Sequence, residues 1–271
     1  MATVIFFHAH PDDEALSTGG TMALLAESGH RVVLVVATRG EEGEPVEGIL
    51  VDGESLGSRR TAEVATSARI LGVERVEFLG YRDSGMAGEE TNANPDCFWQ
   101  ADVNDASRRL ASLLADESVD LAVFYDPNGG YGHPDHIQVH RVGTQWAELA
   151  QISRTRWVTL NRDVIRDGIE DALDAGDFDE VATLSLEERR ERAAQDSFGM
   201  PESQITHAID VRPVVDRKRA AVAAHASQIA DDSFFLAMSP MRFAAAFGTE
   251  WFVDPKAPRS GEPFRTDPLL F

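Results

Sequence analysis

Residues 4–14 read VIFFHAHPDDE, in which an apolar run stops at a histidine and three acids directly follow a proline. Val4 to Phe7 are β-branched or aromatic, a pattern typical of a strand buried on both faces inside a parallel sheet. Pro11 suits the first position of a helix, and the helix dipole favours acids in a first turn. We therefore expect residues 10–14 at the carboxyl end of a central strand, where open α/β sheets bind ligands.

A second stretch, YGHPDH at residues 131–136, repeats this arrangement after the apolar run 121–125. Taken alone, either stretch is equally well interpreted as a capped helix start without chemistry. Two His-Pro-Asp sequences at two strand ends of one chain are difficult to explain by capping. The pair indicates a site that holds a metal or moves protons.

Composition limits the partners of this protein. The 271 residues include 25 basic and 46 acidic ones, for a formal net charge of -21, which argues against nucleic acid and anionic membranes as partners. Cys97 is the single cysteine, so no disulfide can form within the chain. The first apolar run is too short for a signal peptide or a membrane span. We expect a cytoplasmic protein; its number of subunits is not indicated.

Strands and helices alternate through the first half of the chain. The pattern predicts strands at 4–7, 31–37, 76–79 and 119–125, and helices at 12–28, 56–71, 102–118 and 137–150. This order is typical of an α/β, Rossmann-like three-layer fold with a mostly parallel sheet.

The periodicity is weaker after residue 150. It predicts a strand at 156–161, a charged helix at 185–195, an edge strand at 205–211, a helix at 216–229 and an irregular tail from Gly248. We interpret residues 1–271 as a single catalytic domain. In it, residues 1–150 form the α/β core that carries the metal site, and residues 151–271 form a C-terminal elaboration that completes the substrate pocket.

The polar loops all follow predicted strands. They span residues 10–14, 38–44, 80–88 and 126–136. Since the carboxyl ends of parallel strands meet at one edge of a sheet, these loops should form a single site.

The motifs HPDDE at 10–14 and HPDH at 133–136 resemble the paired motifs of the PIG-L (LmbE-like) family of metal-dependent de-N-acetylases, which act on N-acetylglucosamine conjugates. GEEG at 40–43, RDSGMAG at 82–88 and YDPNGGYG at 125–132 look like the actinobacterial branch that deacetylates N-acetylglucosaminyl-inositol in mycothiol biosynthesis. The resemblance covers residues 4–150 closely and residues 217–229 more loosely.

The resemblance implies one Zn²⁺ per chain, bound by His10, Asp13 and His136. Two imidazoles and one carboxylate leave a position open for water, as catalytic zinc sites require, although another divalent metal could compete for these ligands. The resemblance also makes Asp12 the general base that takes a proton from the attacking water. The alternative for Asp12 is a helix N-cap.

His133 resembles the electrostatic residue of the family, a protonated imidazole that stabilises the oxyanion. We expect Asp135 to orient His133 and to raise its pKa, because a nearby negative charge favours the imidazolium. Tyr131 could donate a further hydrogen bond to the same oxygen, or could be a packed aromatic side chain.

Contacts to the substrate are expected from one of two adjacent arginines and from two acids that could accept hydrogen bonds from sugar hydroxyls: Arg59, Arg60, Asp83 and Glu42. Solvated surface charge is the alternative for each of these four side chains. His140 lies four residues after His136 and mimics a zinc-binding pair. We expect it to be packed or to support a ligand, because His10 and Asp13 already fill the site.

The predicted function is metal-dependent removal of acetyl from an N-acetylglucosamine conjugate, a small-molecule substrate. A mycothiol S-conjugate amidase and a deacetylase of another amino sugar are the alternatives within this chemistry; Gly132 favours the deacetylase. A Rossmann-type nucleotide-binding module would need Gly-x-Gly-x-x-Gly after the first strand, where this chain has three acids. A metal-binding protein without catalysis is disfavoured by the presence of Asp12 and His133.

Overall fold

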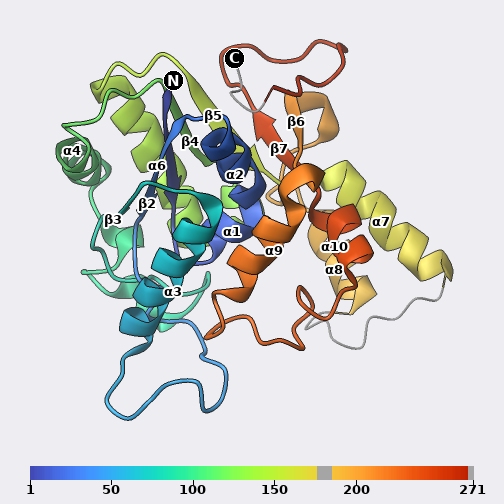
Figure 1. Ribbon diagram of the computed structural model, residues 1–271, viewed down its shortest axis with the longest axis horizontal. Helices are drawn as coiled ribbons and strands as arrows, with labels where there is room; N and C mark the ends of the chain where they lie inside the picture. The colour runs from blue at the N-terminus through green and yellow to red at the C-terminus, as the bar shows by residue number, and fades with distance from the viewer. Residues whose placement is uncertain (176–184, 268–271) are drawn as a thin grey trace.

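The computed structural model describes residues 1–175 and 185–267, and its centre is one seven-stranded sheet (Figure 1). The strand order is β3-β2-β1-β4-β5-β7-β6. The strands are β1 (Thr3–His8), β2 (Arg31–Val36), β3 (Arg75–Phe78), β4 (Leu121–Tyr125), β5 (Thr155–Thr159), β6 (His207–Asp210) and β7 (Thr249–Val253). The first five strands of the chain pair in parallel, while β7 pairs antiparallel with both β5 and β6.

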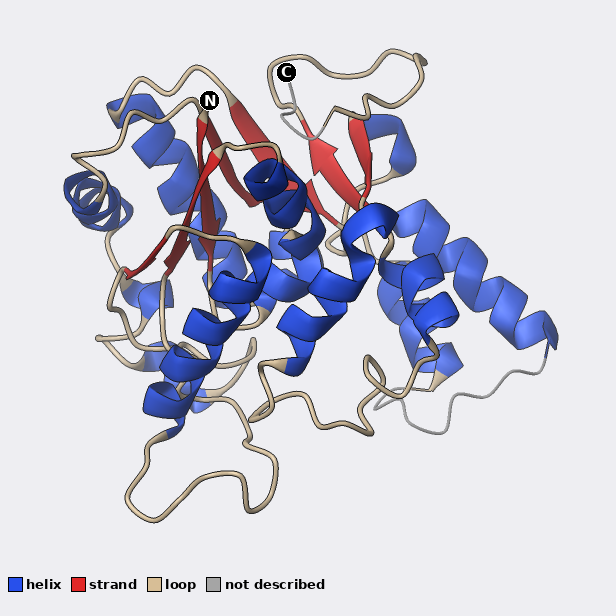
Figure 2. Ribbon diagram, viewed as in Figure 1, coloured by secondary structure: helices blue, strands red, loops and turns tan. Residues whose placement is uncertain are grey.

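Helices cover both faces of the sheet, so the predicted three-layer α/β fold is confirmed. The α-helices of the described residues are α1 (Asp13–Ser17), α2 (Gly19–Glu27), α3 (Leu56–Leu71), α4 (Val103–Leu113), α5 (Gly129–Gly132), α6 (Pro134–Leu149), α7 (Arg162–Ala175), α8 (Leu186–Ala193), α9 (Val215–Ala223) and α10 (Pro240–Phe247). Helices α2, α3 and α9 pack together on one face, and α4 packs on α6 on the other (Figure 2). The helices α7, α8 and α10 lie beyond the β7 and β6 edge (Figure 1).

The core follows the apolar runs of the central strands. Residues 4–7 of β1 are fully buried, as are residues 32–36 of β2 and 121–123 of β4. Strands buried on both faces need near-continuous apolar sequence. This explains why the apolar runs predicted these strands although polar and apolar residues do not alternate in them. The residues that follow these strands are thereby fixed at one edge of the sheet.

The helix predicted at 12–28 is two helices. Thr18 has φ -137° and ψ 4°, outside helical geometry, and separates α1 from α2. Its hydroxyl contacts a ring nitrogen of His8 at 2.8 Å, a contact that the sequence pattern does not reveal. Pro11 was wrongly expected to open the helix: it lies in the turn before Asp12, whereas Pro134 does occupy the first turn of α6.

The irregular tail expected from Gly248 is wrong at its start, because Thr249–Val253 forms β7. The segment carries Trp251 and Phe252, which favour a strand, and the prolines begin only after it. The predicted edge strand is confirmed as β6. Helices α7 and α10 were not predicted; α7 is rich in charge and contains a glycine, and α10 has only eight residues.

The part of the chain after residue 150 is joined to the core by a buried ion pair. Lys218 Nζ of α9 lies 2.7 Å from Glu250 Oε1 of β7, and both side chains are almost fully buried. Glu250 also accepts hydrogen bonds from the backbone N–H groups of Gly20 and Thr21, at 2.8 Å each. These N–H groups open α2 and have no partner within the helix, so one carboxylate connects three elements.

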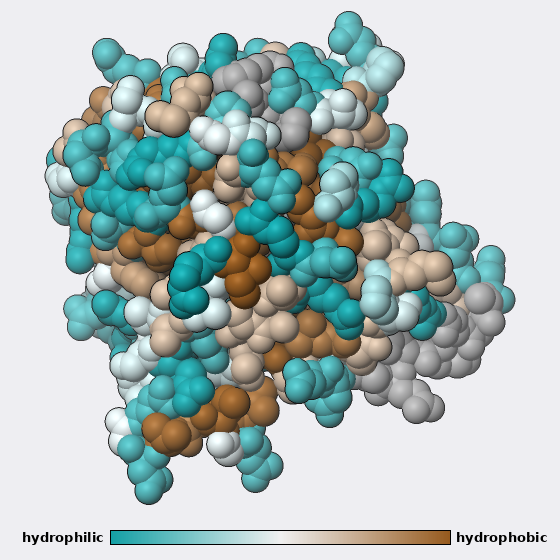
Figure 3. Space-filling model, viewed as in Figure 1, coloured by the Kyte–Doolittle hydropathy of each residue, from teal (hydrophilic) through white to brown (hydrophobic). Residues whose placement is uncertain are grey.

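The surface seen in Figure 3 is mainly hydrophilic, in keeping with the acidic composition. Apolar residues show on the loop between β2 and α3, where Val51 is 65% exposed. None of the described helices is long and apolar enough to cross a membrane.

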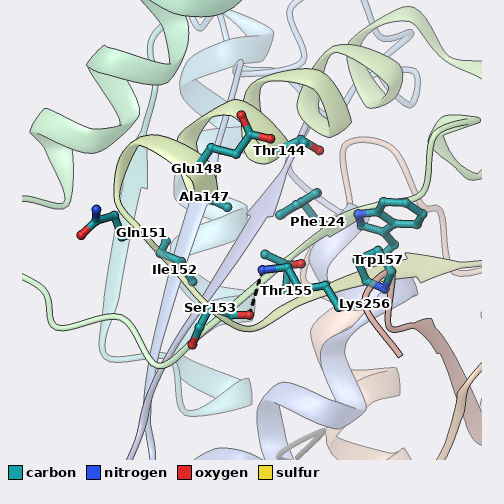
Figure 4. Close-up of a pocket in the computed structure, with 11 residues that line it drawn as sticks. Phe124, Thr144, Ala147, Glu148, Gln151, Ile152, Ser153, Thr155, Trp157 and Lys256 are labelled. Carbon is teal, nitrogen blue, oxygen red and sulfur yellow. Dashed lines mark hydrogen bonds between the residues drawn. The ribbon is translucent and has the colours of Figure 1, made fainter. Parts of the chain in front are cut away.

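A cavity of about 380 Å³ lies between the end of α6 and the start of β5 (Figure 4). Phe124, Trp157 and Ile152 form its apolar part, and Lys256 lies at its edge. No residue of the two His-Pro-Asp motifs lines this cavity.

The Lys218–Glu250 pair gives a test of how the C-terminal part is held. Glu250→Ala should lower the free energy of unfolding by about 3–5 kcal/mol, because it leaves a buried ammonium without its counter-charge and two helix N–H groups without an acceptor. Chemical denaturation measures this change. Asp210→Ala, which removes the exposed Asp210–Arg212 pair, is the matched control and should leave stability nearly unchanged. Equal effects of the two substitutions would contradict the assignment.

Candidate active site

The loops after β1, β3 and β4 meet at the carboxyl edge of the sheet, the lower end of the strands in Figure 1. His10 and Asp13 come from the first loop and the start of α1. Asp83 comes from the loop after β3, and His133 and His136 lie at the start of α6. The expectation that the polar loops form one site is confirmed for these three loops.

The three predicted metal ligands converge on one another. Asp13 Oδ2 lies 3.4 Å from His10 Nδ1 and 3.3 Å from His136 Nε2, and it accepts the backbone N–H of His10 at 2.8 Å. All three side chains are buried. The structure thus brings together residues that are more than 120 positions apart in the sequence; their role as ligands stays a prediction.

Two further acids and a third histidine surround His10. Its Nε2 lies 3.1 Å from Asp135 Oδ2 and 3.3 Å from Asp83 Oδ1. Among the described residues, two groups have ligand atoms within 4.8 Å of one another: His10, His133 and His136, and His10, Asp83 and Asp135. The sequence indicated neither His133 nor Asp83 as a candidate ligand.

The electrostatics of the site favour a cation. Burial opposes protonation of His10, but Asp83, Asp13 and Asp135 together raise its pKa well above the ordinary value. Burial likewise opposes ionisation of Asp13, but His136 and His10 hold its pKa well below the ordinary value. A nitrogen and oxygen donor set with this surplus of carboxylates fits a divalent metal ion.

Asp12 lies beside this cluster with a distinct set of partners. Its carboxylate Oδ2 is 3.0 Å from Arg60 Nη2, and its side chain is 18% exposed. Burial raises the pKa of Asp12 to about 6, although Arg60 opposes the rise. Asp12 does occupy the N-cap position of α1, but its side chain accepts no capping hydrogen bond, so capping does not account for its carboxylate.

His133 differs from expectation. Its Nδ1 accepts the backbone N–H of Asp135 at 3.1 Å, which places the proton of a neutral ring on Nε2. Burial, together with His10 and His136, lowers the pKa of His133 to about 2. The carboxylate of Asp135 instead bonds to His10 and to the hydroxyl of Ser84. The expectation that Asp135 keeps the His133 pKa high is therefore wrong.

Two tyrosines flank His136. The hydroxyl of Tyr131 lies 3.5 Å from His136 Nε2. The ring of Tyr125 is stacked on His136 with centroids 4.2 Å apart and an interplanar angle of 8°. His136 Nδ1 lies 3.2 Å from the carbonyl oxygen of Gly129, which leaves Nε2 free to face Asp13.

The four expected substrate contacts are divided between the site and its rim. Arg60 is buried and also donates to the carbonyl oxygens of Gly40 and Pro11, at 2.9 and 2.5 Å. Arg59 points away, paired with Glu54 at 2.6 Å. Asp83 accepts the backbone N–H of Glu42 at 3.2 Å. The loop after β2 therefore contacts the loop after β3 beside His10.

A polar cavity of about 670 Å³ adjoins this rim at the start of α3. Glu41, one of its lining residues, accepts the backbone N–H of Asp83 at 3.1 Å and so connects the cavity to the site. Arg39, Arg82 and the hydroxyls of Ser58 and Thr61 also line the cavity.

His140 is packed, as expected. Its Nδ1 contacts the carbonyl oxygen of Tyr125 at 2.9 Å, and its ring packs edge-on against Trp157. Sequence reasoning missed Ser84 and Tyr125 as partners of site residues. Ser84 stands in a loop that the sequence did mark, but which of its residues reaches Asp135 depends on the fold of that loop.

Comparison with known proteins assigns the class. The family model PIG-L, described as GlcNAc-PI de-N-acetylase, matches residues 5–147. A relative from Acidothermus cellulolyticus is 40% identical over 93% of this chain and 88% of its own length. The chain therefore belongs to the PIG-L family, and the predicted resemblance is confirmed.

The particular relatives share a name. The proteins from Acidothermus cellulolyticus and from Thermobispora bispora, the second 37% identical over 92% of this chain and 87% of its own length, are both named 1D-myo-inositol 2-acetamido-2-deoxy-alpha-D-glucopyranoside deacetylase. Among solved structures, N,N'-diacetylchitobiose deacetylase from Pyrococcus horikoshii is similar, with a TM-score of 0.58 and 23% identity over 93% of this chain and 82% of that one. The last comparison supports the fold.

The backbone at Gly129 gives a test of how His136 is placed. A Cβ at Gly129 would lie 2.7 Å from His136 Cβ and 2.8 Å from the backbone N of Ile137. Gly129→Ala should displace His136 and lower metal affinity about 10- to 100-fold, measured by titration of metal-free protein. Gly130→Ala is the control: it also has positive φ, but a Cβ there meets nothing within 4 Å. Equal losses in the two variants would contradict this reading of the loop.

Proposed function

We propose that this protein is a metal-dependent N-deacetylase whose substrate is N-acetylglucosaminyl-inositol. The observation that carries the proposal is the convergence of His10, Asp13 and His136, with Asp12 beside them, in a chain 40% identical to a relative named for that reaction. An acidic protein with a polar rim suits an uncharged polyol substrate and an amine product. The place of this reaction would be mycothiol biosynthesis, in the cytoplasm.

We assign the metal to His10, Asp13 and His136, and zinc as the ion that two imidazoles and one carboxylate fit best. When bound there, zinc supplies a Lewis acid that polarises the acetyl carbonyl and makes water more acidic. Asp83 and Asp135 accept hydrogen bonds from the opposite nitrogen of His10. Such outer carboxylates fix the ring orientation of a ligand histidine.

Asp12 acts as the general base. Its carboxylate takes a proton from the attacking water, and the resulting carboxylic acid donates that proton to the departing amine. A pKa of about 6 suits both directions near neutral pH, because the group is mostly ionised yet still basic. The Arg60 guanidinium, 3.0 Å away, keeps this carboxylate oriented.

His133 stabilises the oxyanion as a neutral donor rather than as an imidazolium. Its Nε2 carries the proton because Nδ1 accepts the backbone N–H of Asp135. The Nε2–H group, with the hydroxyl of Tyr131, would donate to the oxygen that gains charge as the carbonyl is attacked. A neutral imidazole avoids placing a second cation beside a metal ion.

For the substrate, we assign contacts with sugar hydroxyls to Glu42, at the rim, and to Asp83, which lies beside His10. Of the two arginines, Arg60 lies in the site and Arg59 outside it. We further propose that residues 151–271 and 1–150 act as one catalytic domain, since β5, β6 and β7 continue the sheet that carries the site.

Substrate assays test the reaction. Purified protein should release acetate and a free amine from N-acetylglucosaminyl-inositol faster than from N-acetylglucosamine, and faster than it cleaves a mycothiol S-conjugate. A chelator should abolish turnover, and zinc should restore it. Full activity after chelation, with metal absent by mass spectrometry, would refute the metal-dependent mechanism. Fastest cleavage of the thiol conjugate would make the protein an amidase.

Two substitutions separate ligand from base. Asp12→Asn should retain metal and lower kcat about 10²- to 10⁴-fold, because the proton acceptor is lost. His136→Ala should lose the metal itself, as measured by metal content after dialysis. Loss of metal from Asp12→Asn with retention in His136→Ala would mean that the two roles are assigned wrongly.

A further inference from the structure

A buried polar cluster lies next to Asp12 and accepts its backbone N–H group. It consists of Glu14 in α1, Ser67 in α3 and His225 just after α9, and all three side chains are fully buried. Glu14 Oε1 accepts hydrogen bonds from Ser67 Oγ at 2.5 Å and from His225 Nε2 at 2.7 Å. We call these three residues the Glu14 cluster.

The second oxygen of Glu14 holds the backbone of Asp12. Glu14 Oε2 accepts the N–H of Asp12 at 2.9 Å. Asp12 has φ 106° and ψ -31°, a backbone conformation that residues other than glycine rarely adopt. Such a conformation persists only when the surrounding structure stabilises it. The hydrogen bond to Glu14 supplies that support at the backbone.

Asp12 is therefore held from two sides. Arg60 bonds to its carboxylate and to the carbonyl oxygen of Pro11, while Glu14 bonds to its N–H group. The first contact sets where the carboxylate points, and the second sets the backbone from which it projects. Since a displacement of about 1 Å can reduce turnover about 100-fold, both contacts bear on the reaction.

His225 provides the link to the distant part of the chain. Its segment is fixed on α3 by Ser227, whose N–H and hydroxyl donate to Glu63 at 2.9 and 2.6 Å. Helix α9, which precedes it, is held by the buried Lys218–Glu250 pair. Without His225, Glu14 Oε1 would keep the Ser67 hydroxyl as a donor and lose the N–H group of His225.

We propose that His225 is a positioning residue for the general base: through Glu14 it maintains the backbone conformation that aims the Asp12 carboxylate at the reacting water. The inference rests on the proposed function, since it takes Asp12 as the base. It makes the C-terminal part of the chain a component of the catalytic apparatus rather than a cover for the substrate alone.

The test compares four variants with the unaltered protein on N-acetylglucosaminyl-inositol. His225→Leu removes the donor, and His225→Gln restores an N–H group near the position of Nε2. Ser67→Ala removes the other donor to Oε1 and is the smallest change. His207→Leu is the matched control, because His207 is equally buried in the same part of the chain but lies in β6 and bonds to Thr206.

We expect His225→Leu to lower kcat about 10- to 100-fold with KM changed less than about threefold and metal content unchanged. His225→Gln should recover most of the loss, and Ser67→Ala should lose about two- to fivefold. His207→Leu should lower Tm by as much as His225→Leu but keep kcat. If His225→Leu and Ser67→Ala both keep kcat within about twofold, or if His207→Leu loses as much, the proposal is overturned.

A second measurement is independent of turnover. The amide proton of Asp12, bonded to a carboxylate, should resonate downfield in ¹H–¹⁵N spectra and move upfield in His225→Leu but not in His207→Leu. An unmoved Asp12 resonance in His225→Leu overturns the inference. Inactivity of the unaltered protein on every amide would instead refute the proposed function, and the spectra would still decide the role of His225.

Discussion

The site depends on the concentration of carboxylates around His10. Asp13, Asp83 and Asp135 all lie within 3.4 Å of its ring nitrogens and come from three separate segments. Buried acids at such distances repel one another, so this arrangement requires positive charge between them. The imidazole of His10 lies between them, and the three carboxylates raise its pKa well above the ordinary value. The loop after β3 and the start of α6, which follows β4, are thus joined to the loop after β1 through contacts of their carboxylates with His10.

The parallel sheet places these acids with little help from the loops themselves. Residues 4–7 and 121–125 pair side by side, so the two His-Pro-Asp motifs emerge next to each other. Helix α6 begins at Pro134, and its first turn presents Asp135 and His136 toward the loop from β1. The backbone carbonyl of Gly129 then selects which nitrogen of His136 faces Asp13. Strand order gives the proximity, and backbone hydrogen bonds give the orientation.

Sequence reasoning reached the parts of this protein that local chemistry determines. The buried strands, the helix 56–71 and the convergence of His10, Asp13 and His136 follow from apolar runs and from motifs at strand ends. Contacts between distant side chains were not accessible: the pairing of Asp135 with Ser84 and of Glu14 with His225 depends on how loops and α9 pack. The lowered pKa of His133 was missed for the same reason, because burial and two neighbouring histidines cause it.

The contact between Glu14 and His225 spans 211 positions of the chain. During synthesis, His10, Asp13 and His136 are all made well before His225. The first five strands of the sheet are therefore synthesised before His225, the hydrogen-bond partner of the buried Glu14 carboxylate. A contact between residues so far apart carries a loop-closure entropy cost, and it makes the backbone of the catalytic turn depend on the C-terminal part of the polypeptide.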